Sequence, residues 1–160
     1  MKHLDVLGVR VELPTNQPIV LLRERDGARH LPIWIGAAEA TAIAYAQQGV
    51  VPPRPMTHDL LASVIAALGS RIQRVRIDKL TDGVFHATLV FDGGVEVDSR
   101  SSDAIALAIR VGADVVTTDE VLDTAGITMA EESDDEVERF KEFLDHVSPE
   151  DFDQAQPDNP

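Results

Sequence analysis

The sequence contains no cysteine, and its 160 residues include only one Trp, one Tyr and five Phe. Without cysteine there is no disulfide bridge, no thiolate nucleophile and no zinc site built on sulfur. Because aromatic side chains are so few, aliphatic and alanine packing must form most of the hydrophobic core. The chain is long enough for one domain with a substantial core, so a small disulfide-stapled fold is excluded.

Several catalytic and nucleotide-binding motifs are also missing. The chain has no Walker loop, no dinucleotide-binding glycine fingerprint, no Gly-x-Ser-x-Gly elbow and no His-Glu-x-x-His. No segment is apolar and long enough to span a membrane, and the start, Met-Lys-His-Leu-Asp-Val, lacks the apolar core of a secretory signal. We therefore expect a cytoplasmic protein without membrane contact that is not a standard nucleotidase, serine hydrolase or zinc peptidase.

Positive charge is scarce. Lys and Arg number 14 against 28 Asp and Glu, which gives a formal net charge of −14. Such acidity ordinarily disfavours nucleic-acid binding, because phosphates attract basic surfaces. However, residues 131–160 hold 12 of the acidic residues and only 2 of the basic ones. The rest of the chain is close to neutral, so nucleic acid stays possible as a partner.

Local patterns predict an α+β fold. Alternating apolar and polar residues predict strands over 3–13, 19–24, 29–35, 71–80, 84–91, 95–99 and 114–117. Helical patterns predict helices over 36–48, from Thr57 as N-cap to Leu68, from a cap at Ser101 or Ser102 to Val111, and over 119–125. We expect residues 1–130 to form the domain, 131–147 an acidic amphipathic helix and 148–160 a disordered acidic tail.

Two strand-to-helix junctions resemble each other and indicate an internal duplication. Aligning Glu39 with Asp103 also aligns the alanine-rich segments that follow them, so that Ile43 falls on Leu107. This predicts duplicated strand-strand-helix units that form a mixed sheet with packed helices in a single domain. The alternative is that any two strand-to-helix junctions look alike over so few residues.

The second junction carries a group of polar residues. If Phe91 pairs with Val95 across the Asp92-Gly-Gly94 turn, one strand face holds His86, Glu96, Asp98 and Arg100, with Asp103 at the head of the next helix. Carboxylates, an imidazole and a guanidinium together could bind a divalent cation and a phosphate. Alternating charges on a strand more often mark only its solvated face.

Other polar residues give weaker signals. Arg54 lies between prolines, which would present its side chain from a stiff loop, and His58 and Asp59 begin a helix, where an acidic residue also suits the helix dipole. One basic cluster could follow a nucleic-acid backbone or receive the acidic tail; it consists of Arg71, Arg74, Arg76 and Lys79. Trp34 is expected to be buried at the sheet and helix junction or at a subunit contact.

Three separated segments together resemble the bifunctional nuclease domain family. They are Leu31-Pro-Ile-Trp-Ile-Gly-x-x-Glu-Ala40, Arg54-Pro-Met-Thr-His-Asp-Leu60 and Val97-Asp-Ser-Arg-Ser-Ser-Asp-Ala-Ile-Ala-Leu-Ala108. The resemblance implies an α+β domain of duplicated units, a homodimer, and nuclease activity on DNA and RNA. The family's recurring polar positions fall on Glu39, Arg54, His58, Asp59, Asp98, Arg100, Ser102 and Asp103. Members commonly have Arg-Pro-Ser-Asp where this chain has Arg100-Ser-Ser-Asp103.

Two functional hypotheses follow. In the first, the protein is a metal-dependent phosphodiesterase of low sequence specificity: Asp98 and Asp103 bind Mg or Mn, Arg54 or Arg100 binds phosphate, and His58 or His86 is the acid or base. Asp59 is a further catalytic candidate, and Glu39, Glu96 and Ser102 are secondary ones. In the second hypothesis, the protein is a non-enzymatic dimeric binding or regulatory protein, and the same residues cap helices and pair between the duplicated units.

Overall fold

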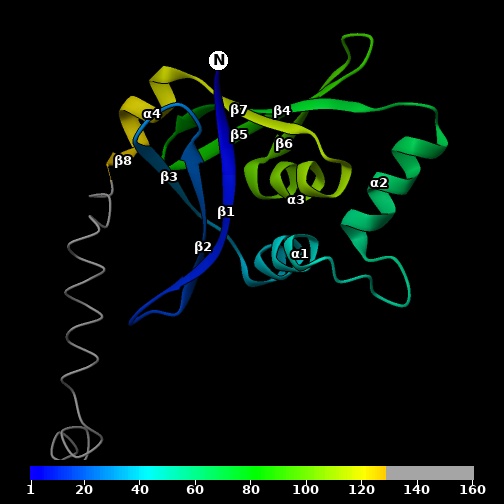
Figure 1. The fold of residues 1–160 in the computed structure, drawn as a ribbon, viewed down its shortest axis with the longest axis horizontal. Coiled ribbons are helices and arrows are strands. Elements are labelled where there is room, and N and C mark those ends of the chain that lie inside the picture. Colours follow the sequence, from blue (N-terminus) through cyan, green and yellow to red (C-terminus); the bar gives the residue numbers. More distant parts are fainter. Residues whose placement is uncertain (129–160) are drawn as a thin grey trace, which may run out of the picture. The chain divides into compact units, whose positions relative to one another are not determined.

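The computed structural model describes residues 1–128, which form one α+β unit of four helices and an eight-stranded mixed sheet (Figure 1). The strands are β1 (Lys2–Glu12), β2 (Gln17–Glu24), β3 (Arg29–Trp34), β4 (Ile72–Thr81), β5 (Val84–Phe91), β6 (Glu96–Arg100), β7 (Asp114–Thr117) and β8 (Ile127–Thr128). The helices are α1 (Ala37–Gln48), α2 (Thr57–Ala67), α3 (Ser101–Val111) and α4 (Asp119–Ala125). The acidic helix and the tail predicted for residues 131–160 lie outside the described residues.

The sheet consists of two antiparallel meanders joined by one short strand. Its order is β6-β5-β4-β7-β1-β2-β3-β8, in which β7 runs parallel to β4 and antiparallel to β1. Strands β1, β2 and β3 lead into α1, and strands β4, β5 and β6 lead into α3. The two halves therefore repeat one arrangement, which agrees with the predicted duplicated units.

The core lies where α1 and α3 pack against the sheet. Leu22, Leu31, Ile43, Ile77 and Ile105 are all completely buried there. The α3 run 104–108 is also buried, because it contacts α1 on one side and the strands on the other. Burying each large aliphatic side chain contributes about 1.5–3 kcal/mol, so this layer accounts for much of the folding free energy.

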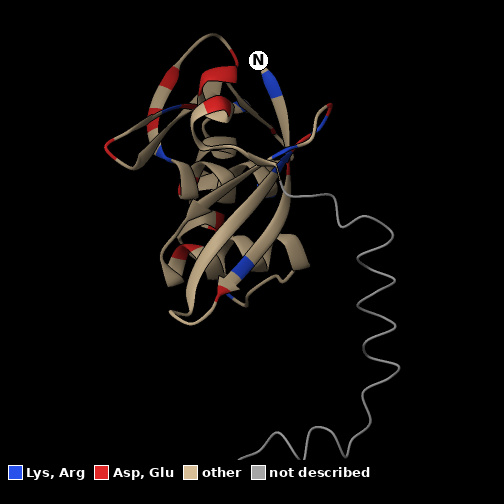
Figure 2. Ribbon diagram, turned by 90° about the vertical axis from the view of Figure 1, so that its left-hand side faces the viewer, with Lys and Arg blue, Asp and Glu red and all other residues tan. Residues whose placement is uncertain are grey.

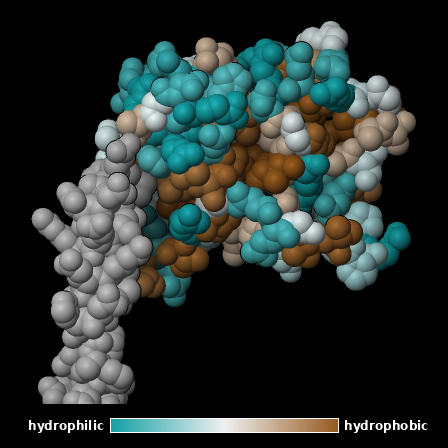
Figure 3. Space-filling view, in the orientation of Figure 1, coloured by the Kyte–Doolittle hydropathy of each residue, from teal (hydrophilic) through white to brown (hydrophobic). Residues whose placement is uncertain are grey.

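Helix α2 forms where the sequence predicts a helix, but it is less buried than α1 and α3. Its apolar residues recur at helical spacing, yet no α2 residue is buried, and the helix lies at the edge of the fold (Figure 1). Leu60, Val64 and Leu68 are 53%, 43% and 80% exposed. In the same orientation, Figure 3 shows hydrophobic surface between polar areas on this face of the molecule. Ala62 and Ile65 of the helix pack against the core, but within the described residues Leu60, Val64 and Leu68 stay exposed.

The predicted helix caps at Thr57 and at Ser101 or Ser102 were wrong. The N-cap residues are Met56 for α2 and Arg100 for α3, and neither side chain caps its helix in the usual way through an oxygen atom. In α2 the side chain at the third helical position bonds to the N-cap residue instead: Asp59 Oδ2 accepts a hydrogen bond of 3.1 Å from the Met56 backbone N–H.

Candidate functional site

Three helices begin with the same local arrangement. Helices α1, α2 and α3 each carry a carboxylate at the third helical position, namely Glu39, Asp59 and Asp103. A negative charge is favourable there because the first backbone N–H groups lack partners within the helix. The fold brings residues from these three helix starts around one pocket, and two of the carboxylates, Glu39 and Asp103, line it.

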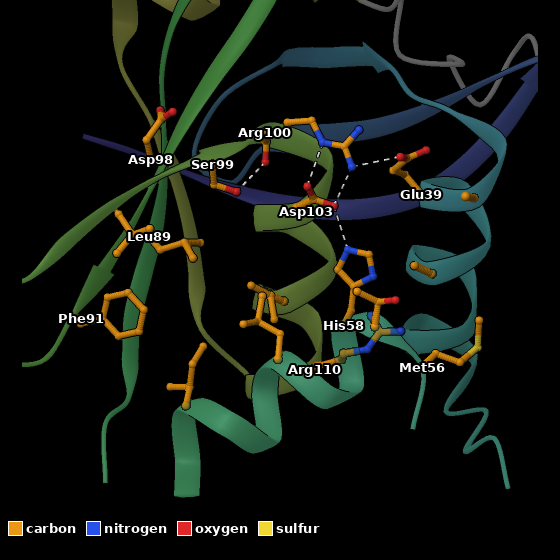
Figure 4. A pocket seen from close by; sticks show the side chains of 17 residues that line it. Glu39, Met56, His58, Leu89, Phe91, Asp98, Ser99, Arg100, Asp103 and Arg110 are labelled. Carbon is orange, nitrogen blue, oxygen red and sulfur yellow. Dashed lines mark hydrogen bonds and ion pairs between the residues drawn. The ribbon is translucent and has the colours of Figure 1, made fainter. Parts of the chain in front are cut away.

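Asp103 is the centre of this cluster (Figure 4). His58 Nε2 lies 2.8 Å from Asp103 Oδ1, and Arg100 donates to both carboxylate oxygens, through Nε at 2.8 Å to Oδ2 and through Nη2 at 3.1 Å to Oδ1. Arg100 Nη2 also pairs with Glu39 Oε1 at 3.0 Å. The His58 side chain is only 15% exposed, whereas that of Arg100 is 65% exposed. The arrangement holds an imidazole in place and presents a cation to solvent.

The charge state of Asp103 determines what His58 can do. Burial is the strongest influence on the pKa of Asp103 and raises it, but hydrogen bonds from Arg100 and His58 together outweigh burial and leave this pKa below its usual value. An ionised carboxylate only accepts hydrogen bonds, so a neutral His58 carries its proton on Nε2. Its Nδ1 then has a lone pair and no hydrogen-bond partner within residues 1–128. Nδ1 can therefore accept a proton from a reacting group.

A second ion pair fixes α2 against α3. Arg110 Nε donates to Asp59 Oδ1 at 2.8 Å, and Arg110 Nη1 donates to the Ala106 carbonyl at 2.9 Å. The hydrogen bond from Arg110 lowers the pKa of Asp59, against the opposing effect of burial. Since His58 precedes Asp59 in the chain, this pair also positions the imidazole.

The cluster lies at a pocket of about 890 Å³ between α1, α2, α3 and the β5–β6 hairpin. Its polar residues include Glu39, His58, Arg100 and Asp103. The other lining residues are mostly apolar: Ala38, Ala42, Met56, Leu61, Ile65, Leu89, Phe91, Val97 and Leu107. A pocket with a small set of polar groups in a largely apolar wall is typical of ligand and active sites.

The structure separates most of the remaining candidates from this cluster, although Asp98 lines the same pocket as Asp103. The predicted register is confirmed, because His86 lies opposite Arg100 and Thr88 opposite Asp98, and the Phe91 N–H bonds to the Val95 carbonyl. The carboxylate of Asp98 nevertheless points away from the Asp103 cluster (Figure 4).

Other candidates have different surroundings. Glu96 pairs with Arg76 at 3.2 Å, and Arg76 also pairs with Asp78, so this part of the basic cluster is occupied by acidic partners. Arg54 is exposed in the loop between α1 and α2. Ser102 is buried and lines a second pocket.

The predicted Mg or Mn ligands do not converge. Asp98 and Asp103 point in different directions, both Asp103 oxygens already accept hydrogen bonds, and within residues 1–128 no three His, Asp or Glu side chains are grouped so that they could hold a metal ion. Two side chains that do not converge fall short of the ligand set that such cations need. The donor set described here therefore does not fit the predicted ion.

Arg110 is a site residue that sequence reasoning missed. Its signal was available, because Asp103, Leu107 and Arg110 follow the i, i+4, i+7 spacing of one helix face. Trp34, expected to be buried at the junction or at a subunit contact, is 56% exposed within the described structure.

Comparison with known proteins gives the family. The family model described as "Bifunctional nuclease domain" matches residues 20–130. This chain belongs to the bifunctional nuclease domain family. It is also 53% identical over 161 residues to two uncharacterized proteins of Mycobacterium tuberculosis, from strains CDC 1551 / Oshkosh and ATCC 25618 / H37Rv. Each match covers 95% of this chain and 98% of the relative.

Two surface features bear on how this family member meets its partners. Acidic positions recur on several elements of the described ribbon, while basic positions are sparser (Figure 2). Because basic positions are sparser, binding of a polyanion would depend on a few well-placed cations, among which Arg100 is exposed at a pocket.

Among the helices described, none has the length and apolar character needed to cross a membrane.

Proposed function

We propose that this protein hydrolyses phosphodiester bonds in nucleic acid, DNA or RNA or both, with low sequence specificity. The observation that carries the proposal is the 2.8 Å hydrogen bond between His58 and Asp103 beside the exposed Arg100, at a pocket of a bifunctional nuclease domain. It provides the parts that such a reaction needs: a base, a group that orients it, and a cation for phosphate.

In the proposed reaction, His58 Nδ1 takes a proton from water as the water oxygen bonds to phosphorus. The bond from phosphorus to the leaving oxygen breaks, and this oxygen takes up a proton from His58 or solvent. Asp103 orients the imidazole and stabilises its charged form, while Arg100 offsets the charge that builds up on the phosphate oxygens. Glu39 holds the Arg100 guanidinium at the pocket.

The test is cleavage of labelled single- and double-stranded DNA and RNA across a size-exclusion peak, with Mg, Mn or chelator. A general base contributes about 10²–10⁴-fold, so we expect His58→Ala and Asp103→Asn each to lose about 100-fold or more. Asp92→Asn, at an exposed turn, is the matched control and should retain full activity. Thermal unfolding of each variant separates loss of chemistry from loss of the fold.

The outcomes distinguish the sites. Loss in Asp98→Asn with full activity in Asp103→Asn would refute the role given to Asp103 and favour Asp98, which lines the same pocket, as suggested by sequence. Activity that survives in both, or that does not follow the protein peak, would refute both assignments. Dependence on Mg or Mn stays a prediction, and the chelator arm tests it; cytoplasmic location likewise stays a prediction.

A non-enzymatic binding or regulatory role is the second candidate. It is favoured by the ion pairs themselves, since Asp59, Asp103 and Glu39 are each paired with an arginine and thereby hold three helices together. No cleavage of any substrate, with unchanged helix packing, would support this role.

We also propose that the protein is a homodimer. The exposed apolar face of α2, formed by Leu60, Val64 and Leu68, supports this, because exposed apolar surface is commonly buried in an interface. Light scattering after size exclusion should give twice the 17.4 kDa chain mass, and the double variant Leu60→Glu, Val64→Glu should give the single mass. A monomeric wild type would refute it.

A further inference from the structure

A second pocket lies beside the candidate active site and has a different character. It measures about 500 Å³ and lies between the beginning of β2, the β3–α1 junction, the β4–β5 turn and the β6–α3 junction. We call it the Trp34 pocket. Its lining residues include Trp34, Gly36, Arg100, Ser101 and Ser102. Arg100 lines both pockets, so the two are neighbours.

The Trp34 pocket suits an anion. Acidic residues outnumber basic ones two to one in this chain, yet none lines this pocket within the described structure, and Arg100 is the charged residue that does. The side chain of Arg100 is 65% exposed; its Nε and Nη2 are bonded to Asp103 and Glu39, which leaves Nη1 to donate to a ligand. A planar guanidinium with several N–H donors matches the oxygens of a phosphate.

Two helix N-termini open into the same space. Gly36 precedes α1 and Ser101 begins α3, and in neither helix does an N-cap side chain accept a hydrogen bond from a first-turn backbone N–H. Ser101 and Ser102 are only 6% and 7% exposed, and both line the Trp34 pocket. Their hydroxyl oxygens are not among the fully buried unpartnered atoms of residues 1–128, so they are open to the pocket and can donate to a ligand there. The helix dipole favours a negative charge at the same place.

Trp34 adds an aromatic surface to this anion site. It is the only Trp in the chain and is 56% exposed although it lines a pocket. An exposed indole face in a pocket is a stacking surface for a planar ring, and every nucleobase has such a ring. A ligand with a phosphate at one end and a planar ring at the other would use both parts of the pocket.

We propose that the Trp34 pocket binds one nucleotide, with its phosphate at Ser101, Ser102 and Arg100 and its base against Trp34. This rests on the proposed function in one respect: the bound nucleotide is then the neighbour of the one that is cleaved, because Arg100 is shared by both pockets. Stacking would hold the strand without selecting its sequence, since all bases offer a π-face.

The test uses the fluorescence of Trp34 in the full chain, titrated with adenosine 5′-monophosphate. We expect saturable quenching, competition by inorganic phosphate without quenching, and binding of adenosine weaker by about tenfold or more. The double variant Ser101→Ala, Ser102→Ala should weaken the nucleotide about tenfold, whereas Ser99→Ala, which lines only the other pocket, should not. By calorimetry, Trp34→Ala should weaken it about tenfold and Trp34→Phe much less.

Several results would overturn the proposal: no quenching at millimolar nucleotide, equal affinity for adenosine and its monophosphate, or unchanged binding in the double serine variant. His58→Ala separates this proposal from the proposed function, because it should retain nucleotide binding while losing cleavage. Nucleotide binding without any cleavage would support the Trp34 pocket and refute the nuclease assignment; cleavage without nucleotide binding would do the reverse.

Discussion

Replacing Arg110 by Met tests how α2 is held, and through it how His58 is positioned. The substitution keeps most of the aliphatic length but removes the 2.8 Å hydrogen bond to Asp59. Helix α2 has no buried residue, and an isolated helix of this length is marginal in water, so its order depends on a few tertiary contacts. The effect should therefore be concentrated in α2 and not spread over the fold.

The size of the effect follows from the geometry. A hydrogen bond to a charged group contributes about 1.5–3 kcal/mol when buried, and the Asp59 side chain is 29% exposed, so we expect a loss of about 1–2 kcal/mol. That corresponds to a rise of about 5- to 30-fold in the equilibrium constant for opening of α2. Hydrogen exchange should show it as faster exchange at the α2 amides, with little change in α1, because α1 packs on α3 without using this pair.

The ion pair between Asp59 and Arg110 also determines how the stability of α2 changes with pH. Asp59 has a lowered pKa in the folded protein, so its stabilising contribution is present above the ordinary aspartate pKa and is lost as the pH falls through the folded value. Wild-type α2 should lose protection in that acidic range, and Arg110→Met should lose much less, because only the Met56 N–H bond to Asp59 and the nearby His58 then remain. Unchanged α2 exchange in Arg110→Met, or loss spread equally over the sheet, would refute the reasoning. If α2 does loosen, cleavage should fall along with it.

Two further predictions concern stability. Hydrogen bonds from Arg29 lower the pKa of the buried Glu24. Glu24→Gln should therefore lower the free energy of unfolding by about 1–3 kcal/mol at neutral pH, and by progressively less as the pH falls below the ordinary glutamate pKa. A difference in melting temperature that does not depend on pH would contradict this. A Cβ at position 126 would overlap the backbone carbonyl oxygen of Leu122, so Gly126→Ala should lower stability by about 1–3 kcal/mol in denaturant unfolding, and an unchanged midpoint would count against it.

Much of the fold could be read from local sequence. The short strand 114–117 and the helix 119–125 match their predicted bounds, and the Phe91–Val95 pairing follows from the glycine turn between them. Such elements depend on alternation, helical spacing and turn residues within a few positions, which a sequence displays directly. The candidate residues His58, Arg100 and Asp103 came from motifs and from the family resemblance.

The failures share a physical cause. Alternation places Asp98 and Arg100 on one strand face, but Arg100 is the last strand residue and its side chain meets Glu39 and Asp103 at the helix starts. Helical spacing gives α2 an apolar stripe without saying whether another element covers it. Local sequence patterns determine which way a side chain points from its helix or strand. The packing of the elements determines which residues that side chain contacts.

By itself, the sequence determined the elements, the duplicated plan and the family of this protein. Only the tertiary structure decided that β7 inserts between β1 and β4, and that His58 and Asp103 meet across 45 positions of chain. It also decided that Trp34 lies exposed at a pocket that Ser101 and Ser102 line as well. These are contacts between distant segments, which form because burying α1 and α3 against one sheet leaves the helix starts facing each other.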